Sequence, residues 1–314
     1  LSNQGSGLGD SMKPGQWLDS LTDDRIAFRV TFKDRVPEPA QRYWRGPVLW
    51  DFDGEQWTRN PEDSTPLTRA PGAPDDKAGI AYDVSLEPTE KKYLPALDWP
   101  QTAPTGYYLS QEMTVYSDKP VQKITQYAAQ SSPQPVPTGE LDAITRQRAL
   151  AFPPGFNKRT QALAKQWRAE AADDRAYIER ILEWIRADFS YTLATELPGI
   201  NAVDDFLFTD RKGFCQHFSS SFALLMRAAG IPSRVVTGYA GGYKNPYGDY
   251  WVLYRKDAHA WNEVWLENEG WVRFDPTAAV APENILDTLE SAAGTESYFG
   301  EQSMFSPFFD YGDF

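Results

Sequence analysis

The chain has 314 residues, of which 41% are hydrophobic and 14% aromatic, and its formal net charge is −13. This acidic surplus argues against nucleic-acid binding, which needs Lys and Arg opposite phosphates, and it disfavours adhesion to anionic lipid. The length predicts two domains, and the single cysteine excludes a disulfide within the chain.

The sequence begins at Leu1 and contains no run of the roughly 18 to 20 apolar residues that span a bilayer. We therefore expect a soluble piece or a mature form, with any contact to a membrane made through segments outside this sequence.

Residues 1–135 are predicted to form a β-rich domain. Residues 24–33 alternate apolar and polar side chains, with Ile26, Phe28, Val30 and Phe32 on one face. Asp53-Gly54 predicts a two-residue hairpin turn within residues 48–59. A calcium loop at Asp51–Gly54 is disfavoured, because its glycine is misplaced and Pro61 lies inside the required span. Further strands are expected within residues 81–86, 107–110 and 112–116.

Residues 136–285 are predicted to form a second, α+β domain after a proline-rich linker at residues 131–139. Helices are expected at residues 160–171 and after Asp174, where Ile178, Ile181, Leu182 and Ile185 recur at helical spacing. Residues 286–314 form an acidic and aromatic extension.

Cys215 directly precedes a third amphipathic helix, which Gly230 ends. The start of a helix favours a thiolate, because unpaired backbone N–H groups and the helix dipole stabilise negative charge there. Thiolate is the nucleophilic form of cysteine. A lone cysteine is more often inert and buried, so the position alone leaves both interpretations open.

The two histidines favour the catalytic interpretation. His217 is turned about 200° from Cys215 around the helix and is expected to be structural. His259 lies on a predicted strand, and the turn E-N-E-G leads into a second strand that ends at Asp275. A thiol, an imidazole and a carboxylate supply the nucleophile, the base and the orienting group of a thiol triad.

The hairpin between His259 and Asp275 needs a particular turn. Gly270 in the left-handed region would set Asp275 opposite Glu263, on the same face as His259 but four residues away along the strand. A bend at Pro276 is expected to close the remaining gap of about 13 Å.

Four sequence blocks carry a family resemblance: K-G-F-C-Q-H-F-S, R-A-A-G-I-P-S-R-V-V-T-G-Y, D-A-H-A-W-N-E-V-W and G-W-V-R-F-D-P-T. They resemble the transglutaminase-like superfamily, in particular the extracytoplasmic part of bacterial inner-membrane proteins of the TgpA type. The resemblance implies an α+β, papain-like core in which a helix carrying Cys215 packs on an antiparallel sheet carrying His259 and Asp275. It implies that Cys215 is the nucleophile, His259 the acid and base and Asp275 the orienting residue. It also implies that the protein acts at the periplasmic face of the inner membrane.

One feature departs from the family pattern. Classical transglutaminases place an oxyanion-stabilising Trp upstream of the cysteine, yet residues 185–214 contain none. Tyr191 is our candidate for this donor, since a phenol can donate a hydrogen bond as an indole can.

The segment after Gly238 is interpreted as an aromatic rim that contacts substrate. Its glycines do not fit a phosphate-binding loop. The rim residues are predicted to be Tyr239, Tyr243 and Tyr247, together with Trp261.

The predicted reaction is acyl transfer from a protein glutamine side chain to a primary amine such as Lys, through a thioester. The partners would be protein or peptide substrates that carry glutamine, and an amine donor. Hydrolysis by the same triad, as a protease or amidase, and a non-catalytic envelope-binding role are the alternatives. No cofactor is expected, and one Cys with two His offers too few ligands for a typical zinc site.

Overall fold

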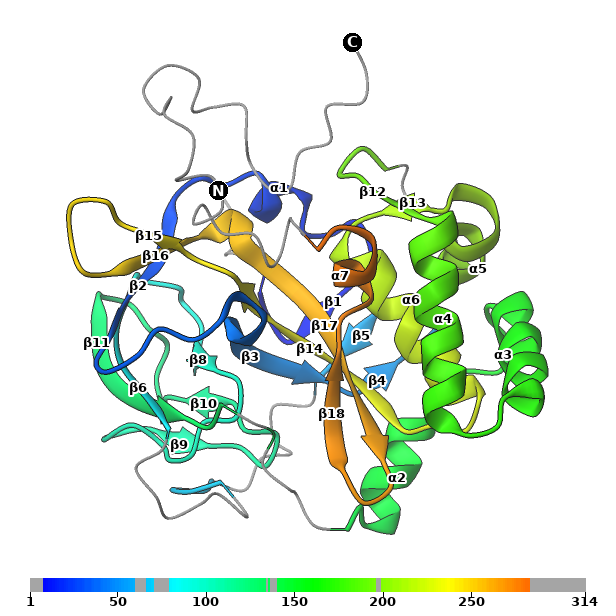
Figure 1. The fold of residues 1–314 in the computed structure, drawn as a ribbon, viewed down its shortest axis with the longest axis horizontal. Coiled ribbons are helices and arrows are strands. Elements are labelled where there is room, and N and C mark those ends of the chain that lie inside the picture. The colour runs from blue at the N-terminus through cyan, green and yellow to red at the C-terminus, as the bar shows by residue number, and fades with distance from the viewer. Residues whose placement is uncertain are drawn as a thin grey trace.

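The computed structural model describes residues 8–59, 66–70, 79–133, 135, 140–195 and 199–282. Two five-stranded antiparallel sheets form its centre, and most helices gather beside one of them (Figure 1). The α+β class predicted from the sequence is confirmed.

The first sheet carries the predicted site residues. Its strand order is β18-β17-β14-β3-β8, and every neighbouring pair is antiparallel. All residues of β14 and β17 are buried, because side chains cover both faces of these central strands. The five strands are β3 (Tyr43–Leu49), β8 (Ala96–Leu97), β14 (Ser233–Ala240), β17 (Ala258–Leu266) and β18 (Gly270–Phe274).

The second sheet has the order β11-β6-β2-β16-β15. The alternation predicted for residues 24–33 appears in β2, where Phe28 and Val30 are buried. Its strands are β2 (Ile26–Phe32), β6 (Ile80–Leu86), β11 (Thr125–Ser131), β15 (Tyr243–Lys244) and β16 (Trp251–Tyr254).

The two predicted domains exchange strands. β3 and β8 come from residues 1–135 yet complete the first sheet, whereas β15 and β16 come from residues 136–285 and join the second. The boundary between two domains at about residue 135 remains a prediction from the sequence. Each five-stranded sheet contains strands from before and from after this residue.

Strand β3 crosses the first sheet with an irregularity at Pro47. The register between β3 and β14 shifts between Val236 and Gly238, where the Thr237 hydroxyl donates a hydrogen bond to the Pro47 carbonyl at 2.8 Å. Proline has no N–H for the ladder, so it is tolerated inside a sheet at such a bulge. Gly238 is required nearby, since a Cβ there would lie 2.0 Å from the Trp44 carbonyl oxygen.

Helix α6 packs against β17 and holds the first sheet to the helical layer. Ser219 donates to the Ala260 carbonyl at 2.7 Å, and the Asn262 amide donates to the Ser219 carbonyl at 3.0 Å. The helices are α1 (Leu18–Leu21), α2 (Ala143–Leu150), α3 (Lys158–Glu170), α4 (Asp174–Asp188), α5 (Ala202–Asp205), α6 (Cys215–Ala228) and α7 (Pro276–Val280), with short 3₁₀ turns at Pro39–Gln41 and Arg255–Asp257 and a π turn at Phe206–Asp210.

Two local predictions need correction. Asp173, not Asp174, caps α4, by accepting the Ala176 N–H at 2.8 Å. The predicted hairpin at Asp53-Gly54 exists, but four residues connect its strands rather than two. The Asp53 carboxylate accepts N–H groups from Glu55 and Gln56 and so stabilises the longer loop.

Three small sheets complete the fold, with the orders β1-β5-β4, β7-β10-β9 and β12-β13. Residues 286–314, Pro61 and part of the predicted linker lie outside the described residues. The strands of these sheets are β1 (Ser11–Met12), β4 (Asp51–Phe52), β5 (Trp57–Thr58), β7 (Tyr93–Leu94), β9 (Tyr108–Leu109), β10 (Val115–Tyr116), β12 (Ser190–Tyr191) and β13 (Lys212–Gly213).

Candidate active site

Cys215 is the first residue of α6, as the sequence predicts. Phe214 precedes it in an extended conformation and follows directly on strand β13, which ends at Gly213. Every residue of α6 is buried, and Cys215 itself is 0% exposed. The thiol therefore lies at the positive end of a buried helix dipole.

His259 and Asp275 are hydrogen-bonded. The Nε2 atom of His259 lies 2.8 Å from Oδ2 of Asp275, and both side chains are buried. The other ring nitrogen, Nδ1, makes no hydrogen bond to a nitrogen or oxygen atom of the described residues. Asp275 thus fixes one side of the imidazole, and a side-chain hydrogen bond with Cys215 also raises the pKa of His259.

The hairpin that joins these residues differs from the predicted one in register. Gly270 has φ +80°, as predicted, but it pairs with Leu266, so that Phe274 pairs with Asn262. Asp275 therefore comes opposite Trp261, two residues from His259 rather than four. The remaining offset is about 7 Å, and the turn into α7 at Pro276 closes it.

Asp275 has a hydrogen bond at every available position. Its Oδ1 accepts the N–H groups of Thr277 and Ala278, which caps α7. Its Oδ2 accepts from His259 and also from the Tyr43 hydroxyl, at 2.7 Å. Tyr43 belongs to β3, so the N-terminal part of the chain holds the carboxylate in place.

The environment favours the charged forms of both residues. Burial alone would lower the pKa of His259, but the Asp275 carboxylate, with a smaller contribution from Cys215, raises the pKa of His259 to about 10. Burial likewise acts to raise the pKa of Asp275, and the contacts with His259 and Tyr43 outweigh it, so the pKa of Asp275 is lowered. The pair is therefore an imidazolium–carboxylate pair at neutral pH.

Tyr191 lies close to this group. It is the last residue of β12, and its pairing with Gly213 of β13 brings it beside the entry to α6. Burial, followed by the charges of Cys215 and Asp275, raises the pKa of the Tyr191 phenol well above its usual value. The phenol is therefore protonated and able to donate a hydrogen bond.

His217 has a structural environment. Its Nδ1 accepts the N–H of Phe214 at 3.4 Å, and its ring packs against Phe206 and Phe214. Burial lowers the pKa of His217 to about 4, which keeps the ring neutral.

The predicted aromatic rim is only partly at the surface. Tyr239 and Trp261 are 3% and 0% exposed, because they lie within the central strands β14 and β17. These two residues therefore do not form a rim. Tyr243 is partly exposed and Tyr247 is 83% exposed, in the β15–β16 hairpin that Figure 1 shows projecting on the side away from α6.

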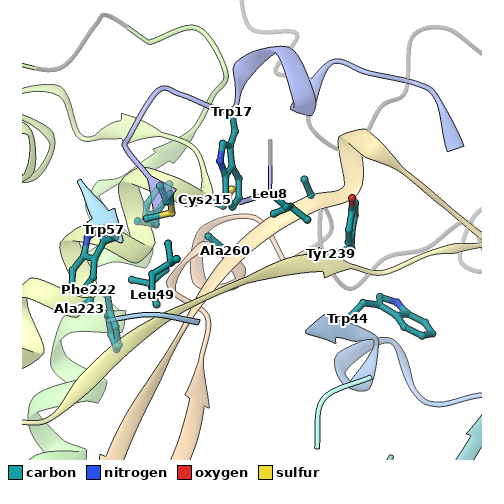
Figure 2. Close-up of a cluster of buried hydrophobic side chains, with 14 of the residues drawn as sticks. Leu8, Trp17, Trp44, Leu49, Trp57, Cys215, Phe222, Ala223, Tyr239 and Ala260 are labelled. Atoms are coloured by element: carbon teal, nitrogen blue, oxygen red, sulfur yellow. The ribbon is translucent and has the colours of Figure 1, made fainter. Parts of the chain in front are cut away.

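Sequence reasoning missed three residues around the site. Tyr43 contacts Asp275, Trp17 lies beside Cys215 (Figure 2), and Gln216 accepts the Trp17 backbone N–H at 3.1 Å. Tyr43 and Trp17 come from the β-rich segment, so no local pattern connects them to the triad.

Within the described part of the chain, no three His, Cys, Asp or Glu side chains cluster as a metal site would require. Among the same residues, no helix combines the length and apolar character needed to cross a bilayer.

Comparison with known proteins identifies the family. Residues 161–276 match the model of the transglutaminase-like superfamily, and residues 2–138 match that of the TgpA N-terminal domain. The protein-glutamine gamma-glutamyltransferase of Pseudomonas aeruginosa is 38% identical over 305 residues, which cover 96% of this chain. The chain belongs to the transglutaminase-like superfamily.

Solved structures agree with this assignment. The crystal structure of the periplasmic domain of TgpA from Pseudomonas aeruginosa superimposes with a TM-score of 0.84 at 37% identity, covering 91% of this chain and 99% of that one. The ethylmercury-bound form of that domain gives a TM-score of 0.83, at 38% identity and with coverages of 89% and 99%. The transglutaminase-like core predicted from the sequence is thus confirmed.

The match to full-length relatives is partial. This chain spans 45% of the length of the Pseudomonas aeruginosa transferase. An uncharacterised protein of Bacillus subtilis, YebA, is 46% identical over 79 residues, which are 24% of this chain and 11% of YebA.

Proposed function

We propose that this chain catalyses cysteine-dependent acyl transfer from a glutamine side chain to a primary amine. The observation that carries the proposal is the His259–Asp275 hydrogen bond of 2.8 Å, together with a side-chain hydrogen bond and a charge interaction with Cys215, both of which raise the pKa of His259. A nucleophile, an acid and base, and an orienting carboxylate are the groups that thioester chemistry requires. The 38% identity to a protein-glutamine gamma-glutamyltransferase supports this choice.

Each residue has a defined role in the proposed reaction. The Cys215 thiolate adds to the amide carbon of glutamine, and the C–N bond then breaks as His259 gives a proton to the departing ammonia. The amine loses a proton to His259 and attacks the thioester, which forms the isopeptide bond and releases the thiolate. Asp275 keeps the imidazole in one tautomer and stabilises its charged form.

Tyr191 is proposed to stabilise the oxyanion of the tetrahedral intermediates. Its protonated phenol, and the influence of Cys215 on that phenol, support the role. Losing one oxyanion donor costs about 100-fold or more in kcat. We expect this loss in Tyr191→Phe, and activity within a few-fold of the parent would remove Tyr191 from the mechanism.

A buried thiol is one condition for transfer rather than hydrolysis, because water competes with the amine for the thioester. Cys215 and His259 are each 0% exposed, so a thioester formed at this thiol is shielded from bulk water. An amine that binds at the site would then resolve the thioester before water does.

We propose that the substrates are proteins or peptides with an accessible glutamine, together with an amine donor such as a lysine side chain. We further propose that the reaction takes place at the periplasmic face of a bacterial inner membrane. The similarity to a domain described as periplasmic supports this location.

The test measures ammonia release and amine incorporation separately on one glutamine-containing peptide. Equal rates of both, abolished in Cys215→Ala, are expected for acyl transfer. Ammonia release without incorporation would assign the chain to the hydrolases. Absence of both activities from the folded parent protein would contradict the proposal.

A further inference from the structure

Trp17 lies beside the nucleophile although it belongs to the N-terminal segment. Both side chains belong to one cluster of buried residues, and they are drawn close together in the view of Figure 2. Trp17 is 1% exposed and Cys215 is 0% exposed. The indole therefore forms part of the wall around the thiol.

A hydrogen bond fixes Trp17 at this position. Its backbone N–H donates to Oε1 of Gln216 at 3.1 Å, across 199 residues of sequence. Gln216 directly follows Cys215 and is 0% exposed, so it ties the N-terminal segment to the first turn of the nucleophile's helix. The Gln216 side chain is itself turned about 100° from Cys215 around the helix, so we assign it to holding Trp17.

The indole N–H of Trp17 is buried and makes no hydrogen bond to any described residue. Such donors are rare in native proteins, because a buried N–H without an acceptor destabilises the fold. Trp261 shares this property but belongs to a different cluster from Cys215. Three other buried indoles have acceptors: Trp57 donates to the Ser220 hydroxyl at 2.9 Å, Trp50 to Glu112 at 3.0 Å and Trp44 to the Gly241 carbonyl at 3.2 Å.

We propose that the Trp17 indole N–H is an oxyanion donor, which the N-terminal segment supplies to the cysteine of the core. This inference rests on the acyl transfer proposed above. When Cys215 Sγ bonds to the amide carbon, the carbonyl π electrons move to oxygen. The resulting oxyanion accepts a hydrogen bond from the Trp17 indole N–H. This bond lasts until the C–N bond breaks and ammonia leaves with a proton from His259. An acceptor that exists only during the reaction accounts for a donor that has no acceptor among the described residues.

The test compares two chemistries at the same thiol in Trp17→Phe, which keeps an aromatic ring and removes the N–H. Release of ammonia from a glutamine peptide passes through an oxyanion, whereas alkylation by iodoacetamide forms an S–C bond and expels iodide without one. We expect kcat for ammonia release to fall by about 100- to 1,000-fold. The KM and the alkylation rate should stay within about threefold of the parent.

Trp57→Phe is the matched control, since it removes a buried indole N–H that does have an acceptor on α6. It should lower the melting temperature more than Trp17→Phe does, while its kcat stays near that of the parent. Activity of Trp17→Phe within threefold of the parent would overturn the inference. A parallel loss of alkylation and turnover would also overturn it, because the indole would then act on the thiol. An inactive parent would instead contradict the proposed function.

A measurement on the parent protein covers the case in which Trp17→Phe does not fold. A peptide aldehyde adds to Cys215 and places the hemithioacetal oxygen where the oxyanion forms. With ¹⁵N-labelled tryptophan, the indole N–H signal of Trp17 should move downfield in this adduct and stay in place in Cys215→Ala. The signal would be assigned in the parent protein, from the nuclear Overhauser contacts of the indole N–H with neighbouring side chains. An unmoved Trp17 signal in the adduct would overturn the inference.

Discussion

His259 and Glu263 lie four residues apart on β17, and β3 supplies a partner to each. Tyr43 donates a hydrogen bond to Asp275, which is in turn hydrogen-bonded to His259. Arg45 binds Glu263 directly with two hydrogen bonds of 2.7 and 2.8 Å. Both groups are buried and charged, and both join the N-terminal part of the chain to the core. The difference between them lies in which atoms have partners.

In the group around Glu263, the carboxylate has hydrogen-bond partners on both of its oxygens. These partners are Arg45 and Arg234. Arg45 also donates hydrogen bonds to the Asp98 carboxylate and to the Glu112 backbone carbonyl. Burial acts against the charge, but Arg45 and then Arg234 outweigh it and lower the pKa of Glu263 to about 2.

The group around His259 is incomplete, because Nδ1 has no nitrogen or oxygen partner among the described residues. Charge and burial are therefore common to both groups and do not distinguish a structural cluster from a catalytic one. We propose that the interaction of His259 with the Cys215 thiol, which raises the pKa of His259, does. The following predictions test this distinction, in order of decreasing expected effect.

Asp275→Asn should reduce kcat by about 10⁴-fold, because an amide no longer holds the catalytic tautomer of His259. The protein should remain folded, since the Asn oxygen can still cap α7 through Thr277 and Ala278. Steady-state kinetics and a thermal melt check both statements. Activity within tenfold of the parent would show that the carboxylate does not orient the base.

Arg45→Met should have the opposite profile. Removing one partner of a buried ion pair costs about 3 to 5 kcal/mol of stability, while kcat of the folded protein should stay within about threefold. Urea unfolding combined with kinetics on the folded fraction measures this. Arg45→Met with Glu263→Leu should recover part of the loss, and no recovery would argue against a purely structural cluster.

Tyr43→Phe should reduce kcat by about tenfold, because Asp275 loses one of its hydrogen bonds. The Tyr43 contact lowers the pKa of Asp275, so its loss should move the acid limb of the pH–activity profile to higher pH. Tyr177→Phe is the control, since that hydroxyl donates to the Leu225 carbonyl far from the triad. If both variants gave the same profile, Tyr43 would have no specific role in positioning Asp275.

The smallest effects concern the pH dependence of stability. The folded pKa of His259, about 10, lies above its unfolded value, so its contribution is complete below about pH 6.5 and is lost as pH rises through 10. The folded pKa of Glu263, about 2, is depressed, so its contribution is present above about pH 4.5 and is lost as pH falls through 2.

Denaturant titrations of the two variants separate these contributions. The stability difference between the parent and Asp275→Asn should shrink by about 1 kcal/mol or more between pH 6 and pH 10.5. The difference between the parent and Arg45→Met should shrink between pH 5 and pH 2. Differences that do not change with pH would contradict the charges assigned to these groups.

Features set by neighbouring residues were predictable from the sequence. The alternation in β2, the helical spacing in α4 and the glycine conformation at Gly270 depend on a few adjacent positions. Cys215, His259 and Asp275 were singled out because family motifs mark them, and their catalytic roles remain a proposal. The predicted register of the hairpin was wrong by two residues, because the loop from Glu267 to Glu269 places Asn268 at φ +66° as well.

Features set by distant pairing were not predictable. No local pattern indicates that β3 lies between β14 and β8, or that Tyr43 comes within hydrogen-bonding distance of Asp275, 232 residues away. Tyr239 and Trp261 were predicted to belong to an aromatic rim that contacts substrate. Both are buried instead, because the central strands are covered on both faces.

Pro47 in β3 has a consequence for the synthesis of the chain. Its partner residue Thr237 lies 190 residues later, so β3 leaves the ribosome long before β14 exists. An apolar strand with a free edge is a template for aggregation, and a proline within it withholds one of the N–H groups that a foreign strand would bind. The irregularity at Pro47 weakens the finished sheet at this point. We expect it to protect the nascent chain from aggregation until β14 has been synthesised and pairs with β3.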